Sequence, residues 1–296
     1  MTIAGLQIRV ARTVVDGPGA ARFEASSRTT VDQRLTEAVV HFSDEGSGRP
    51  VLLLHGFPST HLLWKRVSPL LAAAGFRAIV PDLVGYGASE AAEDIPIDAA
   101  SQARWQLEFL DALRFGAETV VVAHDIGTAV AQLMVARAPA RIGKLILIDG
   151  VYADRWAMEA VESIRNWDPS RASGLSKVLA RRSRSWTKSP ITAQLLGEML
   201  ASFDGERGGQ RLIRAAGSLD PQQTAAILDQ LRQQHPLSLV LWGADDAFLS
   251  VDEVARPLAD LLGAELKVLP GGHFLPIDAP DLVAEEVLRF ARSPSH

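Results

Sequence analysis

The chain has 296 residues, of which 47% are hydrophobic and 22% charged, with a net charge of −5 and no cysteine. This length and composition are typical of one large globular domain, or of a domain with a smaller insertion. The negative charge gives no electrostatic case for nucleic-acid binding, and the lack of cysteine excludes disulfides and thiolate chemistry. No apolar run approaches the roughly 20 residues that span a bilayer, and the first residues lack a signal peptide's apolar segment. The sequence therefore predicts a cytoplasmic protein with no membrane or nucleic-acid partner.

Residues 1–35 carry few structural signals. Ile8-Arg9-Val10 and Val14-Val15 indicate strand pieces, and residues 16–19 form a turn signal, so this part is an extension or an added edge strand. From Ala38 onward, apolar runs of strand length alternate with helical patterns. The predicted strands are 39–42, 51–54, 78–80, 119–123 and 145–148, and the predicted helices are 61–74, 98–115 and 129–138. This alternation predicts a mostly parallel sheet with helices on both faces, an α/β fold.

The alternation stops after Gly150. Residues 151–234 show helical patterns at 158–164, 175–182, 191–202 and 224–231, and no clear strand. It resumes with strands at 237–242 and 266–269 and helices at 252–262 and 280–292. We therefore predict a core made of residues 1–150 and 235–296, with a helical cap domain, residues 151–234, inserted over the carboxyl edge of the sheet.

The most informative segment runs from Val120 to Val130 and reads VVVAHDIGTAV. It predicts a strand, a tight corner and a helix, with Asp125 at the corner. An aspartate before a helix commonly caps it, but the flanking His124 and Gly127 favour a reactive carboxylate. Such a group is already charged at neutral pH, so it can attack carbon and form an ester without help from a base.

Polar loops follow the other predicted strands as well. They read His55-Gly56-Phe57-Pro58, then Gly243-Ala244-Asp245-Asp246, then Gly271-Gly272-His273-Phe274. The carboxyl ends of parallel strands meet at one edge of the sheet, where open α/β sheets place their sites. We expect these loops to meet Asp125 there.

The ordered motifs H-G-x-P, D-x-x-G-x-G-x-S (residues 82–89), H-D-x-G, G-x-x-D and a late Gly-His carry a family resemblance. Over residues 39–290 the chain resembles the α/β-hydrolase-fold superfamily, in the aspartate-nucleophile branch of epoxide hydrolases and haloalkane dehalogenases. The resemblance implies that Asp125 is the nucleophile, His273 the base and Asp246 the acid that orients it. It also implies an oxyanion hole formed by the backbone N–H groups of Phe57 and Ile126.

Two points about these residues stay open in the sequence. Asp245 and Asp149 are alternatives to Asp246 as the acid. The basic run at residues 181–184 is interpreted as a solvated face of the cap, although an excess of basic residues over 151–220 would suit an acidic substrate.

The side chains expected to bind the substrate come from the loops and the cap. They are His55, Tyr152, Trp156, Trp186 and Phe274. The tryptophans predict a small molecule that is apolar or aromatic.

The leaving group separates the two activities of this branch. A halide needs hydrogen-bond donors, and neither Ile126 nor Phe57 has one in its side chain, which argues against haloalkane dehalogenation. Epoxide hydrolases use cap tyrosines, and only Tyr152 of the two tyrosines lies near the cap. The favoured prediction is an epoxide hydrolase that forms an aspartyl ester, which a His-activated water then hydrolyses.

Several alternatives remain beside that prediction. They are dehalogenation, ester or C–C hydrolysis, tailoring of a secondary metabolite, and ligand binding without turnover. No motif indicates a metal or another cofactor, and the chain is expected to be a monomer or a homodimer.

Overall fold

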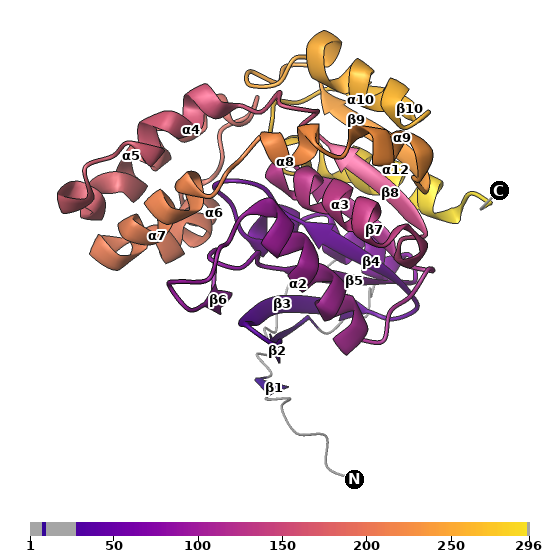
Figure 1. Cartoon of the computed structure of the whole chain (residues 1–296), viewed down its shortest axis with the longest axis horizontal. Coiled ribbons are helices and arrows are strands. Elements are labelled where there is room, and N and C mark those ends of the chain that lie inside the picture. Colours follow the sequence, from indigo (N-terminus) through magenta and orange to yellow (C-terminus); the bar gives the residue numbers. More distant parts are fainter. Residues whose placement is uncertain (1–7, 10–27, 295–296) are drawn as a thin grey trace, which may run out of the picture.

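The computed structural model describes residues 8–9 and 28–294, and it shows a single large sheet with helices packed on both faces (Figure 1). The strand order is β1-β2-β3-β5-β4-β7-β8-β9-β10, with β6 (Glu90–Ala91) paired to β3. The strands are β1 Ile8–Arg9, β2 Thr29–Arg34, β3 Ala38–Gly46, β4 Arg49–Leu54, β5 Phe76–Pro81, β7 Val120–His124, β8 Lys144–Ile148, β9 Leu237–Gly243 and β10 Glu265–Leu269. The pairings from β5 through β4 to β10 are parallel, and those from β1 to β3 and on to β5 are antiparallel. The predicted α/β architecture with a mostly parallel sheet is confirmed.

The central strands form the core of the molecule. Residues 51–54 of β4 and 120–123 of β7 are each at most 1% exposed, because parallel strands covered on both faces bury every side chain. In the register of the sheet, Leu54 lies opposite Ala123, and His124 lies opposite Ile148. The loops that follow β4, β7 and β8 therefore begin at the same edge.

Helices form a layer on each side of the sheet. α2 (Ala99–Ala112) and α3 (Ile126–Arg137) contact each other on one face of the sheet, and α12 (Pro280–Arg292) lies on the other (Figure 1). α1 (Ser68–Ala73) contacts α12. Asp98 caps α2 as predicted, since its side chain accepts the N–H of Ser101 at 2.8 Å. The smaller core helices are α10 (Arg256–Leu261) and α11 (Leu275–Asp278).

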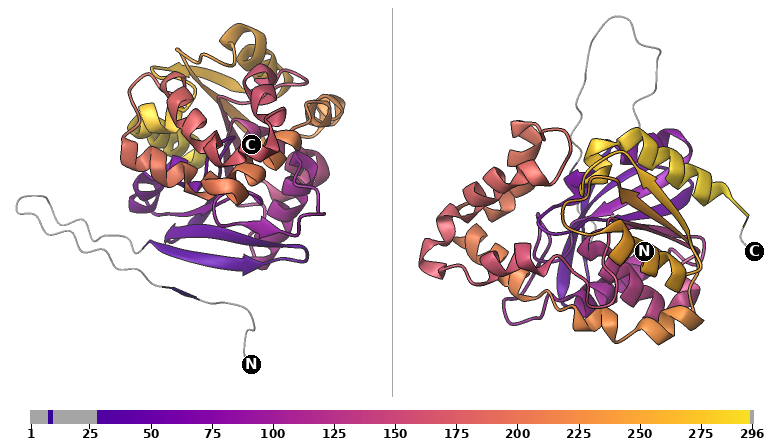
Figure 2. Two further views of the ribbon diagram at one scale, coloured as in Figure 1. Left: turned by 90° about the vertical axis from the view of Figure 1, so that its left-hand side faces the viewer. Right: turned by 90° about the horizontal axis from the view of Figure 1, so that it is seen from above.

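A group of cap helices stands beside the sheet, on the left in Figure 1 and again in the right-hand view of Figure 2. They are α4 Met158–Arg165, α5 Leu175–Arg182, α6 Ala193–Leu200 and α7 Gly205–Gly217. Two further helices, α8 (Gln222–Ala225) and α9 (Leu228–Gln233), contact α3 of the core. The division of the chain at residues 150 and 235 stays a prediction, and these contacts favour a return to the core near residue 220.

Helix α7 was not predicted from the sequence, which carries four glycines between Gly205 and Gly217 and so has low helix propensity. Gly209 explains part of this composition. A Cβ at that position would overlap the backbone of Ala172 in the turn of 3₁₀ helix at Pro169–Gly174. The glycine therefore allows α7 to pack closely against its neighbour in the cap.

The N-terminal expectations can be compared with the structure only in part. Ile8–Arg9 pairs with β2 as an added edge strand, whereas Val10, Val14-Val15 and the turn at 16–19 lie outside the described residues. Of the helices in the described part of the chain, none has the length and apolar character needed to cross a membrane.

Candidate active site

The corner between β7 and α3 presents Asp125 at the carboxyl edge of the sheet. Its φ of 51° and ψ of −125° form a left-handed conformation that residues other than glycine rarely adopt. The side chain makes no capping hydrogen bond, so helix capping does not account for it. A Cβ on Gly56 would overlap the Asp125 side chain, and one on Gly127 would overlap the carbonyl of His55. Both glycines therefore make room for the Asp125 carboxylate at this corner.

The two oxygens of Asp125 have different surroundings. Oδ1 accepts the backbone N–H of Phe57 at 2.6 Å, and the N–H of Ile126 also helps to lower the pKa of this carboxyl. Oδ2 lies 3.5 Å from Nε2 of His273. One oxygen is thus held by the backbone, and the other faces the imidazole.

The imidazole of His273 is fixed from both sides. Its Nδ1 donates to Oδ2 of Asp246 at 2.9 Å, and Oδ1 of Asp246 accepts the N–H groups of Phe248 and Leu249 at 2.8 and 3.1 Å. The carbonyl of His273 accepts Nε2–H of His124 at 2.7 Å. These contacts direct Nε2 toward Asp125.

The other two candidates for the acid lie elsewhere. Asp245 turns outward, where its carboxylate pairs with Lys188 at 2.7 Å. Asp149 is fully buried at the end of β8, and its Oδ1 accepts the N–H of Gly243 at 2.6 Å. Its Oδ2 has no hydrogen-bond partner among the described residues. Of the three candidates for the acid, only Asp246 is hydrogen-bonded to His273.

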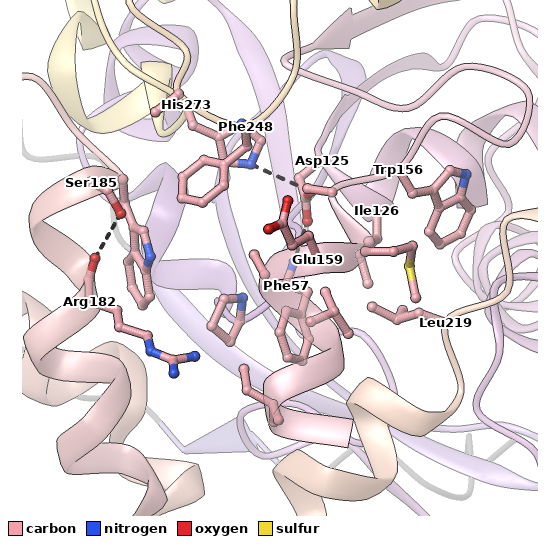
Figure 3. A pocket seen from close by; sticks show the side chains of 18 of the residues that line it. Phe57, Asp125, Ile126, Trp156, Glu159, Arg182, Ser185, Leu219, Phe248 and His273 are labelled. Carbon is pink, nitrogen blue, oxygen red and sulfur yellow. Dashed lines mark hydrogen bonds and ion pairs between the residues drawn. The ribbon is translucent and has the colours of Figure 1, made fainter. Parts of the chain in front are cut away.

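A cavity of ≈ 560 Å³ lies over Asp125 and is lined by residues of both the core and the cap (Figure 3). Three residues expected to bind the substrate, Trp156, Trp186 and Phe274, are among its lining residues, and so is Phe57. The Trp186 ring stacks on Phe274 with centroids 5.0 Å apart and an interplanar angle of 12°. Further lining residues that the sequence did not single out are Met158, Glu159, Arg182, Leu219 and Phe248.

Two of the expected substrate contacts are corrected by the structure. His55 is buried outside the cavity, where Nδ1 donates to the carbonyl of Gly56 and Nε2 accepts the N–H of Leu83, each at 2.9 Å. Its role is to hold two loops together. Tyr152 is likewise not a lining residue, and its backbone bridges to Arg155 where the chain enters the cap.

A sequence model described as "alpha/beta hydrolase fold" matches residues 49–280. The chain belongs to the α/β-hydrolase fold family.

Relatives of this α/β hydrolase have two activities. An epoxide hydrolase from Caballeronia sordidicola is 25% identical, over 86% of this chain and 91% of the relative. A haloalkane dehalogenase from Mesorhizobium japonicum is 27% identical, over 81% and 84%. The crystal structure of Cfl2 from Burkholderia cenocepacia has the same fold, with a TM-score of 0.77 at 24% identity over 90% of this chain and 96% of that one. The protein is thus a hydrolase of the epoxide hydrolase and haloalkane dehalogenase type.

The charges of this hydrolase site are coupled through His273. Burial alone would lower the pKa of His273, but the charge of Asp246 and the hydrogen bond and charge of Asp125 raise it well above its ordinary value. Burial alone would raise the pKa of Asp125, yet His273 lowers it. Both shifts favour the charged forms of the pair, an imidazolium at His273 and a carboxylate at Asp125.

The neighbouring histidines stay neutral. Burial, together with the charge of His273, lowers the pKa of His124 to about 4, and burial lowers the pKa of His55 to about 4. No cluster of three or more His, Cys, Asp or Glu side chains suited to a metal ion occurs in the part of the chain that the structure describes.

We expect Asp125→Asn to lower the pKa of His273. The substitution removes a negative charge 3.5 Å from Nε2, and that charge favours the imidazolium. Titration of ¹⁵N-histidine signals by NMR measures the change, with the signal of exposed His235 as an internal reference and His273→Gln for assignment. An unchanged or higher pKa in the variant would contradict this coupling.

We expect Asp149→Asn to stabilise the protein increasingly as the pH rises above about 4, the ordinary pKa of an aspartate. Burial and the Asp246 charge raise the pKa of Asp149 well above its ordinary value, so the folded protein holds a proton that the unfolded chain releases above about pH 4. Wild-type stability falls over that window, and an asparagine removes this fall. Melting temperatures across the window measure it, with Asp260→Asn, on the exposed face of α10, as the control. Parallel curves for Asp149→Asn and wild type would contradict a protonated Asp149.

Proposed function

We propose that the protein hydrolyses an epoxide through a covalent ester on Asp125. The observation that carries the proposal is that the two Asp125 oxygens have different partners. Oδ1 is bound by the Phe57 N–H at 2.6 Å, so Oδ2 is the oxygen that attacks carbon. Once the ester forms, its carbonyl oxygen is Oδ1, and the same N–H stabilises the negative charge that develops when water adds.

The charges of the site fit the opening of an epoxide. In the first step the Oδ2–carbon bond forms, the carbon–oxygen bond of the ring breaks, and the epoxide oxygen becomes an alkoxide. Ester formation also removes the Asp125 charge that favours the imidazolium of His273. His273 therefore releases its proton, which reaches the alkoxide through a water in the cavity.

The neutral imidazole is then the base for the second step. Nε2 of His273 takes a proton from water, and the resulting hydroxide adds to the ester carbonyl. The tetrahedral intermediate then collapses by breaking the bond between Cγ and Oδ2 of Asp125. The proton of the added hydroxyl passes to the departing alkoxide, which leaves a diol, the Asp125 carboxylate and a protonated His273. Asp246, bound to Nδ1 at 2.9 Å, stabilises the imidazolium that forms. The cycle ends with the charges of the resting site.

The opened oxygen also needs a hydrogen-bond donor on the cap. Trp156 is not free for this role, because its indole N–H donates to Thr224 at 2.8 Å. The hydroxyls of Ser163 and Ser185 donate to backbone carbonyls. Within the described residues, Trp186 lines the cavity and its indole N–H donates to no protein group, and Arg182 also has free N–H groups there. We assign Trp186 to the leaving oxygen, because its ring stacks on Phe274, the residue next to His273.

A halide as leaving group is the second candidate, favoured by the haloalkane dehalogenase relative at 27% identity. A halide needs donors that hold it without a proton transfer. The residues that form the N–H pair of the site, Phe57 and Ile126, have side chains that cannot donate. A halide would also leave the His273 proton without an acceptor in the substrate. Both points favour the epoxide.

We expect His273→Gln to trap the ester. The glutamine cannot take the proton from water, so the adduct accumulates while Asp125 still attacks. Intact-mass measurement after incubation with a panel of epoxides and haloalkanes detects the gain in mass, and peptide mapping locates it. The double variant with Asp125→Asn is the matched control and should remain unmodified.

The outcomes of this trapping experiment separate the alternatives. An adduct from epoxides alone supports the proposal, and adducts only from haloalkanes would assign the second candidate. No adduct from any compound that the wild type consumes would contradict a covalent mechanism. Saturable binding without turnover, unaffected by Asp125→Asn, would make the protein a ligand-binding member of the family.

We expect Trp186→Phe to lower kcat for an epoxide by about tenfold to a hundredfold, which is the usual effect of losing one hydrogen bond to a developing charge. Phenylalanine keeps the stacking on Phe274 but has no N–H. Tyr152→Phe is the control and should change kcat less than twofold, because Tyr152 does not line the cavity. Steady-state rates of diol formation measure both. A greater loss in the tyrosine variant would contradict the assignment.

A further inference from the structure

The three arginines of the basic run at residues 181–184 are exposed, in line with a solvated face of the cap. Arg182 also lines the cavity, whereas Arg181 and Arg184 do not. Arg182 ends α5 and Trp186 follows four residues later, so the two side chains reach the cavity from successive turns of the chain. Arg182 therefore faces both the solvent and the cavity.

The guanidinium of Arg182 is held in place without being neutralised. Its Nη1 donates to Oγ of Ser163 on α4 at 2.6 Å, and no carboxylate of the described residues forms an ion pair with it. Figure 3 shows the guanidinium pointing from the cap wall into the cavity. The remaining N–H groups of the fork are free to bind a planar anion, and a carboxylate fits this fork in two parallel hydrogen bonds.

The surroundings of Arg182 specify the rest of such a ligand. The nearby cavity wall consists of apolar side chains, among them Val161, Ile164 and Leu179. Glu159 also lines the cavity, and its side chain is a carboxylate like that of Asp125. These two carboxylates repel an anion, and a phosphate dianion more strongly than a carboxylate. The charges therefore orient an amphiphile with its carboxylate at Arg182 and its neutral end at Asp125.

We propose that Arg182 binds the carboxylate of an amphiphilic substrate, namely an epoxide that carries its acid group at the far end of an apolar body. This inference rests on the proposed function and adds the substrate class to it. In this proposal Arg182 selects substrates that carry a carboxylate and takes no part in the bond-breaking steps.

The kinetic test compares an ω-epoxy alkanoate with its methyl ester on wild type and on Arg182→Gln. The glutamine keeps an amide that reaches Ser163 and removes the charge. We expect KM for the acid to rise about tenfold, which is at the lower end of the effect of a charge-assisted hydrogen bond because Arg182 is partly exposed to solvent. KM for the ester and kcat for both should change less than twofold. Arg181→Gln and Arg184→Gln, outside the cavity, are the matched controls.

One further variant and one further condition test whether Arg182 has only a structural role. Arg182→Lys keeps the charge and should restore part of the preference for the acid. Added salt should raise KM for the acid in wild type and not in Arg182→Gln, because salt screens only the ionic contact. Circular dichroism and melting temperature show that each variant is folded. An equal rise of KM for acid and ester in Arg182→Gln would assign Arg182 to packing and overturn the proposal.

A binding experiment keeps this inference separate from the proposed function. Calorimetry with a saturated alkanoate, which has no electrophilic carbon, is carried out on Asp125→Asn with and without Arg182→Gln. We expect about tenfold weaker binding in the double variant, and no difference would overturn the proposal. If wild type opens no epoxide but this difference is found, the proposed function fails and the carboxylate site stands.

Discussion

A buried site at the edge of the sheet has to accommodate three carboxyl groups around one imidazole. The side chains of Asp125, Asp149 and Asp246 are all buried, and the charges near His273 raise its pKa well above the ordinary value. Charges removed from water are stable only when they are paired and hydrogen-bonded. The structure meets this condition by giving His273 two carboxylate neighbours, while burial and the charge of Asp246 raise the pKa of Asp149 well above its ordinary value. Each change of charge on Asp125 therefore changes the pKa of His273.

The cap and the His273 loop are held together by direct contacts. The carbonyl of Trp186 accepts the N–H of Phe274 at 2.7 Å, and the carboxylate of Asp278 accepts N–H groups from Lys188, Ser189 and Gly272. The stacked rings of Trp186 and Phe274 lie beside these bonds. The wall that faces the substrate and the loop that carries the imidazole therefore form one rigid unit, which keeps the proposed donor and the proposed base in register.

Much of the core and of its reactive edge could be predicted from the sequence, because local pattern determines both. Buried parallel strands give continuous apolar runs, and the corner after β7 requires Gly127 and a residue that tolerates the left-handed region. The preference for Asp246 over Asp245 matches the geometry, since one carboxylate turns inward and its neighbour pairs with Lys188. The roles assigned to these residues remain proposals.

The cap shows why the rest could not be predicted. Which of three neighbouring arginines faces the cavity depends on the rotation of α5, which packing against other cap helices sets. Tyr152 and His55 were expected at the substrate for their chemistry, yet the backbone turns one away and hydrogen bonds in the loops engage the other. Helix α7 was missed because close packing against Ala172 outweighs the low helix propensity of its glycines. In each case contacts between distant parts of the chain determine the structure, and the local sequence pattern does not indicate it.

The lack of a side chain at Gly56 matters for the reactive carboxylate and not for the fold. The methyl group of an alanine there would compete with the Asp125 side chain for one volume, while the strands on either side of the loop would remain intact. Displacement of that carboxylate would cost it the Phe57 N–H and its alignment with His273. A chain with alanine at position 56 would therefore keep its fold, but its Asp125 carboxylate would no longer be placed to attack the substrate.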